Sequence, residues 1–308
     1  MLTNFFGKSN PVNLIITFVL FLGFYSTTVF SHFTLDEIVL QGALMHLSNL
    51  GLYVLLFFFF NFILAKNKLT LYNSYGFLFF VILFGIFPFT IFNRYELFIN
   101  VVLLIFLRRV FSLRTPKATF KKMFDSGFWL SISFIFNPFT LVFGILIYTS
   151  IALFQKLTLK TLLIPMVGFL VPLFCYFTYC FWYDEVDSFW GMFLWYTQYN
   201  FQFYTRTEVL APLIFVGLIV AISIALKTPK VFLISGNYRK FWILTLVSLL
   251  VSVLLIAITK NKTGSELMYA FFPLSVILTN WVEGMSKRFF QELVLAIFLI
   301  ASIVLLII

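Results

Sequence analysis

Residues 128–155 read FWLSISFIFNPFTLVFGILIYTSIALFQ and contain no charged side chain. As one helix this stretch would be about 42 Å long, whereas the hydrocarbon layer of a bilayer is roughly 30 Å thick. Asn137 and Pro138 lie near its middle, and proline removes a helical hydrogen-bond donor. We therefore predict two membrane helices, 127–136 and 139–155, that meet at this pair. The first is short, so it either is re-entrant and lines a cavity or belongs to an ordinary hairpin extended by residues 121–126.

The rest of the chain has the same character. Hydrophobic residues make up 62% of the 308 residues, charged residues make up 10%, and the mean hydropathy is +1.05. About a quarter of a soluble domain is charged, so the composition excludes a soluble enzyme, a nucleic-acid-binding domain and a disordered chain. The two cysteines, Cys175 and Cys180, lie in one apolar stretch, which indicates neither a disulfide framework nor a cysteine metal site.

Continuous apolar runs demand helices rather than strands in lipid. We predict an all-α, polytopic transmembrane bundle that forms a single integral-membrane domain over residues 1–308, with about eleven spans. The expected spans are 12–32, 44–65, 74–92, 96–112, 127–136, 139–155, 161–182, 209–226, 241–259, 267–284 and 290–308.

The loop charges predict the orientation. With the N-terminus in the cytoplasm, most of the 21 lysines and arginines fall on the cytoplasmic side, including the clusters in 108–122 and 227–240, and most of the 11 acidic residues fall outside. Positive residues are retained in cytoplasmic loops, so the net charge of +10 reflects topology and contact with membrane lipids. We expect a multi-pass protein of the bacterial cytoplasmic (inner) membrane.

Two acidic residues at the first outer boundary are candidates for chemistry. Asp36 and Glu37 could act as a general base or hold a divalent metal. The alternative is structural, because Thr34 and Glu37 have the spacing of a helix capping box. His32 and His46 flank the same loop, and two histidines alone are weak evidence of a metal site.

Two further outer segments carry aromatic and basic side chains. Residues 183–208 include Trp195, Tyr199 and Arg206. Such rings settle at the lipid headgroups, but they can also stack on sugars, and Arg206 could bind a phosphate. Lys260 and Lys262 lie in the outer loop between the expected spans 241–259 and 267–284, where they could bind a lipid phosphate or be tolerated loop charges.

The arrangement resembles the lipid-linked glycosyltransferases of the GT-C superfamily, in a small version. The resemblance rests on Asp36 and Glu37 just outside the first span, on the broken stretch from Gly127 to Pro138, and on residues 266–274, ELMYAFFPL. The chain also resembles a set of Phe-rich, multi-pass bacterial inner-membrane proteins, for which membership implies no activity. Unlike most members of the superfamily, it has a first outer loop of only about a dozen residues and no soluble outer domain.

The superfamily resemblance implies sugar transfer from a polyprenyl-phosphate donor on the outer face. Asp36 or Glu37 would then activate the acceptor or hold a divalent metal. The implied donor-binding residues are Arg206, Lys260 and Lys262 for the phosphate, with Trp195 and Tyr199 over the sugar. Two alternatives remain. One is a non-catalytic subunit bound to other membrane proteins, and the other is a lipid or solute transporter, which would usually place ionisable residues inside its spans.

Overall fold

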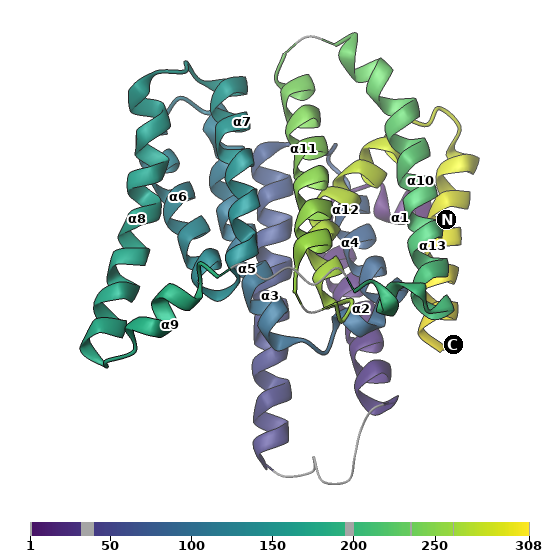
Figure 1. Ribbon diagram of the computed structural model, residues 1–308. Helices are drawn as coiled ribbons and strands as arrows, with labels where there is room; N and C mark the ends of the chain where they lie inside the picture. Colours follow the sequence, from purple (N-terminus) through teal and green to yellow (C-terminus); the bar gives the residue numbers. More distant parts are fainter. Residues whose placement is uncertain (1, 32–39, 195–199, 235, 261, 308) are drawn as a thin grey trace. The chain divides into compact units, whose positions relative to one another are not determined.

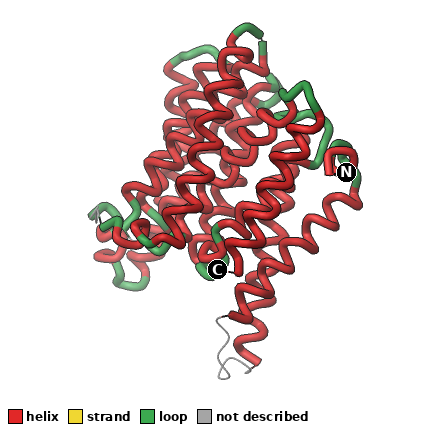
Figure 2. The backbone as a smooth tube through the Cα atoms, turned by 90° about the vertical axis from the view of Figure 1, so that its right-hand side faces the viewer, coloured by secondary structure: helices red, strands yellow, loops and turns green. Residues whose placement is uncertain are grey.

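The computed structural model describes all residues except 1, 32–39, 195–199, 235, 261 and 308. In the described part of the chain every regular element is a helix and no strand occurs (Figure 2). The prediction of an all-α protein is therefore confirmed.

Six helices among the described residues are long and apolar enough to cross a membrane. They are α2 (Pro11–Ser31), α3 (Leu40–Asn67), α8 (Leu159–Trp182), α10 (Thr207–Phe232), α11 (Asn237–Ile258) and α13 (Arg288–Ile307) (Figure 1). The structure thus supports a membrane protein with six candidate spans, and not the expected count of about eleven.

The other expected spans are shorter or more polar helices. They are α4 (Tyr75–Ile86), α5 (Arg94–Phe111), α6 (Thr119–Phe136), α7 (Gly144–Phe154) and α12 (Met268–Glu283). The remaining elements are α1 (Leu2–Phe6), α9 (Val186–Gly191) and the 3-10 helices η2 (Pro88–Thr90), η3 (Ser112–Arg114), η4 (Pro138–Phe143), η5 (Gln202–Thr205) and η6 (Ser265–Leu267). An apolar run indicates a buried segment, and either protein or lipid can surround such a segment.

The chain divides into two compact units. The first comprises 1–97, 200–235 and 262–308, and the second comprises 98–199 and 236–261. The chain passes from one unit to the other repeatedly, so each unit is assembled from separate stretches of the sequence.

The first unit is built around α4, which packs against α2, α12 and α13 and whose residues are all buried. Phenylalanine rings fill the space around it. Phe60 stacks on Phe80 with ring centroids 3.9 Å apart, and Phe84 meets Phe271 edge to face at 4.9 Å. Aromatic pairs contribute roughly 0.5–1.5 kcal/mol beyond the area they bury. A helix of about 18 Å is thus held by protein on all sides.

In the second unit α6 and α8 cross at two glycines. A Cβ atom on Gly127 would lie 1.9 Å from the carbonyl oxygen of Pro165, and one on Gly168 would lie 2.2 Å from that of Phe124. Small residues let helix backbones approach closely in membranes. This crossing therefore depends on glycine at both positions.

The predicted break at Asn137 and Pro138 is confirmed. α6 ends at Phe136, Pro138 starts η4, and the Asn137 side chain accepts a hydrogen bond from the Phe139 amide at 3.1 Å. The first limb begins at Thr119 instead of residue 127, so it includes the extension by 121–126 that the hairpin alternative required.

Candidate functional site

The structure places the predicted site residues very differently. Asp36, Glu37, Trp195 and Tyr199 lie outside the described residues, as does His32. Lys260 is exposed and belongs to the second unit, whereas Arg206 and Lys262 belong to the first. Of the predicted phosphate-binding residues, the first unit thus contains Arg206 and Lys262.

These two cations lie over aromatic rings of the segment before α10. The Lys262 ammonium lies 4.9 Å from the ring centroid of Phe201, and the Arg206 guanidinium lies 5.6 Å from that of Phe203. Cation–π contacts of this kind are worth roughly 0.5–1 kcal/mol at exposed sites. Residues 201–206 therefore pack on the turn that leads into η6.

A glycine makes this packing possible. Gly264 has φ of +86°, which favours glycine over residues with a side chain. A Cβ atom there would lie 2.4 Å from the Phe203 ring and 2.6 Å from the Phe89 ring. Both the backbone conformation and the ring contacts require glycine, and the turn brings Ser265 and Glu266 under segment 201–206.

Glu266 is the most buried acidic side chain of this turn, with 1% of its surface exposed. Its Oε1 atom accepts a hydrogen bond of 2.6 Å from the Tyr204 hydroxyl. Its Oε2 atom is buried and has no hydrogen-bond partner among the residues that the structure describes. A buried acceptor without a partner costs roughly 1–3 kcal/mol, so an exchangeable proton or a ligand could satisfy Oε2.

A second carboxyl group lies close by. Glu96, in the first turn of α5, is 8% exposed and accepts a hydrogen bond from the Tyr269 hydroxyl. Asn93 positions it, because its Oδ1 atom accepts from the Glu96 amide at 3.2 Å and its Nδ2 atom donates to Ser265 at 3.0 Å. We call Glu96, Glu266, Tyr204, Tyr269 and Lys262 the carboxyl cluster.

The electrostatics of the carboxyl cluster follow from its burial. Burial raises the pKa of Glu96 to about 7; the Tyr269 hydrogen bond lowers it and the Glu266 charge raises it. Burial, together with the Glu266 and Glu96 charges, raises the pKa of Tyr204 well above its usual range. Burial lowers the pKa of Lys262, and Glu266 opposes that change. The tyrosine therefore stays protonated as a donor, while Glu96 can exchange a proton near neutral pH.

The carboxyl cluster contains two acidic groups and no histidine. No group of three or more metal-binding side chains occurs among the described residues. His46 Nδ1 instead lies 3.1 Å from the Tyr25 hydroxyl. The arrangement is suited to proton transfer and to binding an anion at Lys262.

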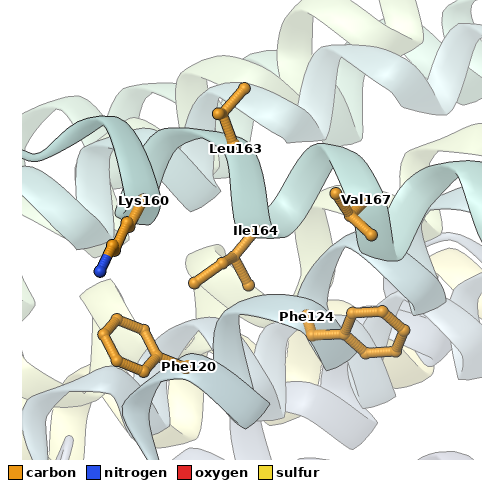
Figure 3. A pocket seen from close by; sticks show the side chains of 6 residues that line it. All are labelled: Phe120, Phe124, Lys160, Leu163, Ile164 and Val167. Carbon is orange, nitrogen blue, oxygen red and sulfur yellow. The ribbon is translucent and has the colours of Figure 1, made fainter.

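A separate groove lies between α6 and α8 (Figure 3). It has a volume of about 430 Å³, and Phe120, Phe124 and Ile164 line it together with Lys160. Figure 3 shows Ile164 pointing from α8 towards α6, with the Lys160 ammonium on the same side as the Phe120 ring. One lysine beside an apolar surface offers no group for acid–base chemistry.

Sequence reasoning missed the pairing of Glu96 with Glu266. Each lies at a helix start, where an acidic residue is ordinarily explained by the helix dipole. The two signals that could have indicated a site are the aromatic residues after Glu266, which include Tyr269, and the tyrosine in the loop at 204. Their meeting is a tertiary contact that spacing does not reveal.

The comparisons with known proteins give one relationship. No curated protein and no solved structure matches the chain. The sequence pattern described as "Family of unknown function (DUF6427)" matches residues 6–308, almost the whole length. The chain therefore belongs to the DUF6427 family.

Proposed function

We propose that the protein is a membrane-embedded transferase that moves a sugar from a polyprenyl-phosphate donor at the outer face of a bacterial cytoplasmic membrane. The observation that carries the proposal is the unpartnered Oε2 atom of Glu266 within a cluster that also holds Lys262. Glu266 and Lys262 are close enough for their charges to interact. An acceptor oxygen and a nearby cation are what a reaction needs when a proton leaves an acceptor and an anion departs.

The chemistry divides between the two sides of the cluster. Lys262 and Arg206 would bind the donor phosphate, and the rings of Phe201 and Phe203 that lie under these cations would contact the sugar. Trp195, Tyr199 and Lys260 remain proposed contributors to donor binding. Asp36 and Glu37 remain a second proposed acidic pair, for acceptor activation or a divalent metal.

The transfer step is a displacement at the anomeric carbon of the donor sugar. The hydroxyl oxygen of the acceptor attacks the anomeric carbon, the bond between that carbon and the phosphate oxygen breaks, and Glu266 takes the hydroxyl proton. The leaving polyprenyl phosphate carries the negative charge, which Lys262 stabilises.

Substrate access requires a movement. The Tyr204 hydroxyl covers Glu266, so segment 201–206 has to open before an acceptor reaches the carboxylate. Such opening and closing of a loop also excludes water from the reaction.

The experiment measures binding and turnover separately. Purified protein is titrated with polyprenyl phosphate and with uncharged polyprenol, and hexose release from polyprenyl-phosphate hexose is followed. We expect the phosphate to bind roughly tenfold more tightly than the alcohol. K262Q removes that difference, and E266Q keeps binding but stops release. E208Q, at an exposed acidic residue of α10, is the matched control. Equal affinity for both lipids contradicts the proposal.

A second candidate is proton-coupled transport. It is favoured by two buried carboxyl groups, Glu96 and Glu266, because burial and the Glu266 charge raise the pKa of Glu96 to about 7. Proteoliposomes with an internal pH dye distinguish the candidates. A proton leak that E96Q abolishes and that polyprenyl phosphate does not affect favours transport.

A further inference from the structure

A second polar site lies at the other end of α12. The helix begins beside Glu266 and ends beside Gly284. α10 packs along α12. Tyr204, just before α10, donates a hydrogen bond to Glu266 at the start of α12. At the end of α12, a Cβ atom on Gly284 would lie 3.0 Å from the Lys227 ammonium of α10, so the two helices run in the same direction. The 16 residues of α12 extend about 24 Å, so this site is separate from the carboxyl cluster.

At this end the first unit contains a pocket of about 550 Å³. Two segments supply its cations: Lys227 and Lys230 come from the last two turns of α10, and Lys287 comes from the turn between α12 and α13. The volume falls within the usual 300–1,000 Å³ of small-ligand pockets. Lysines on two segments far apart in the sequence thus face one cavity.

The charges of the pocket leave a positive excess. Glu283 is an acidic group whose charge attracts Lys227. Its Oε1 atom already accepts hydrogen bonds from the Leu71 amide at 2.9 Å and the Asn73 side chain at 2.6 Å. Lys230 and Lys287 are exposed and line the pocket, and neither forms an ion pair with an acidic side chain in the described part of the chain. Helix-dipole stabilisation explains lysines at the end of α10 but not Lys287 on another segment.

The remaining lining is apolar. Leu226, Phe290 and Val294 lie on α10 and α13, two of the helices long enough to cross a membrane. A ligand that fits here needs a negative group for the lysines and an apolar part for the helix faces. A soluble phosphate meets the first requirement alone.

We propose that this pocket binds an anionic phospholipid, with the headgroup phosphate between Lys227, Lys230 and Lys287 and an acyl chain along Leu226 and Phe290. The Ser286 hydroxyl, which also lines the pocket, supplies a donor to the phosphate. Basic pockets between membrane helices recognise anionic headgroups in this way. The site goes beyond the proposed transferase and does not depend on it.

Trp281 lines the same pocket and reports on its occupancy. The purified protein in uncharged detergent is titrated with phosphatidylglycerol or phosphatidylcholine whose acyl chains carry bromine, a fluorescence quencher. Subtracting the signal of W281F isolates the quenching of Trp281. We expect phosphatidylglycerol to quench Trp281 at a concentration roughly tenfold or more below that of phosphatidylcholine.

Three variants test the assignment. K230Q/K287Q changes two exposed lysines and should abolish the preference, whereas K117Q/K156Q, with the same charge change in the second unit, should keep it. G284A alters no charge but displaces the Lys227 ammonium, so it should weaken phosphatidylglycerol binding.

Three results overturn the proposal. They are equal quenching by the two lipids, an unchanged preference in K230Q/K287Q, and displacement of phosphatidylglycerol by millimolar inorganic phosphate, which would make the pocket a site for a soluble anion. Each arm is accompanied by a melting curve, so that a variant that unfolds is replaced by the single variants K230Q and K287Q.

Discussion

The stability of the protein should fall as pH rises through neutrality, because Glu96 is buried. Its pKa is raised from 4.5 to about 7, chiefly by burial. A folded-state pKa above the unfolded value means that the folded protein binds the proton more tightly. The stabilisation is therefore complete below about pH 4.5 and is lost as pH rises through about 7.

The magnitude follows from the pKa difference. Between pH 5 and pH 8 the linkage relation gives a loss of about 2.5 kcal/mol in the free energy of unfolding. For a chain of this size that corresponds to a fall in Tm of roughly 5 °C. E96Q cannot ionise and still offers an oxygen to Tyr269, so its melting temperature should lose most of this dependence. The variant E266Q keeps Glu96, and its melting temperature should depend less on pH than that of the wild type, since the Glu266 charge helps to raise the Glu96 pKa.

The assay is a thermal melt followed by tryptophan fluorescence in one detergent at pH 5, 6, 7 and 8. E208Q is the control, because Glu208 is exposed. Burial also raises the pKa of Glu283, so a small slope should remain in E96Q and disappear in E96Q/E283Q. The reasoning is refuted if wild-type protein melts equally at pH 5 and pH 8, or if E96Q retains the full dependence.

Three further substitutions test the packing. G127A should destabilise the second unit by about 2 kcal/mol, since its Cβ atom would meet a helix backbone. The control G217A has open space around its Cβ atom and should be neutral or slightly stabilising. Denaturant titration compares the two variants, and equal stability contradicts the close crossing. Y204F leaves Glu266 without its hydroxyl donor and should cost about 1–3 kcal/mol, measured by the same titration; no loss would mean that the bond is dispensable. G264A should shift segment 201–206, because it combines a positive φ with ring contacts, and faster proteolysis after Arg206 would report it, while an unchanged cleavage rate would not fit.

The features that could be predicted from the sequence are local. The hydropathy of single segments predicts helices, and the pair Asn137 and Pro138 predicts the break between α6 and η4, because capping and the missing proline donor act within a few residues. Whether lipid or protein surrounds a helix depends on the tertiary fold, so local sequence does not predict it. Residues 74–92 read as a span, but α4 is shorter and is surrounded by protein.

The candidate site was only partly predictable for the same reason. Lys262 and Arg206 could be selected as outer cations, and the structure brings both onto the rings of residues 201–203. The proximity of Glu96 to Glu266 could not be predicted, because it arises where Asn93, just before α5, donates a hydrogen bond to Ser265. A hydrogen bond between segments so distant in sequence leaves no periodic pattern.

We infer from the loop charges that the carboxyl cluster faces the outside and the lysine pocket faces the cytoplasm, and cysteine labelling in intact cells tests this orientation. Thr263 and Leu233 are exposed residues next to the two sites, and T263C and L233C would each be made without Cys175 and Cys180. We expect a membrane-impermeant maleimide to label T263C in intact cells and to label L233C only after the cells are permeabilised. Labelling of L233C from outside while T263C stays unreactive would contradict it.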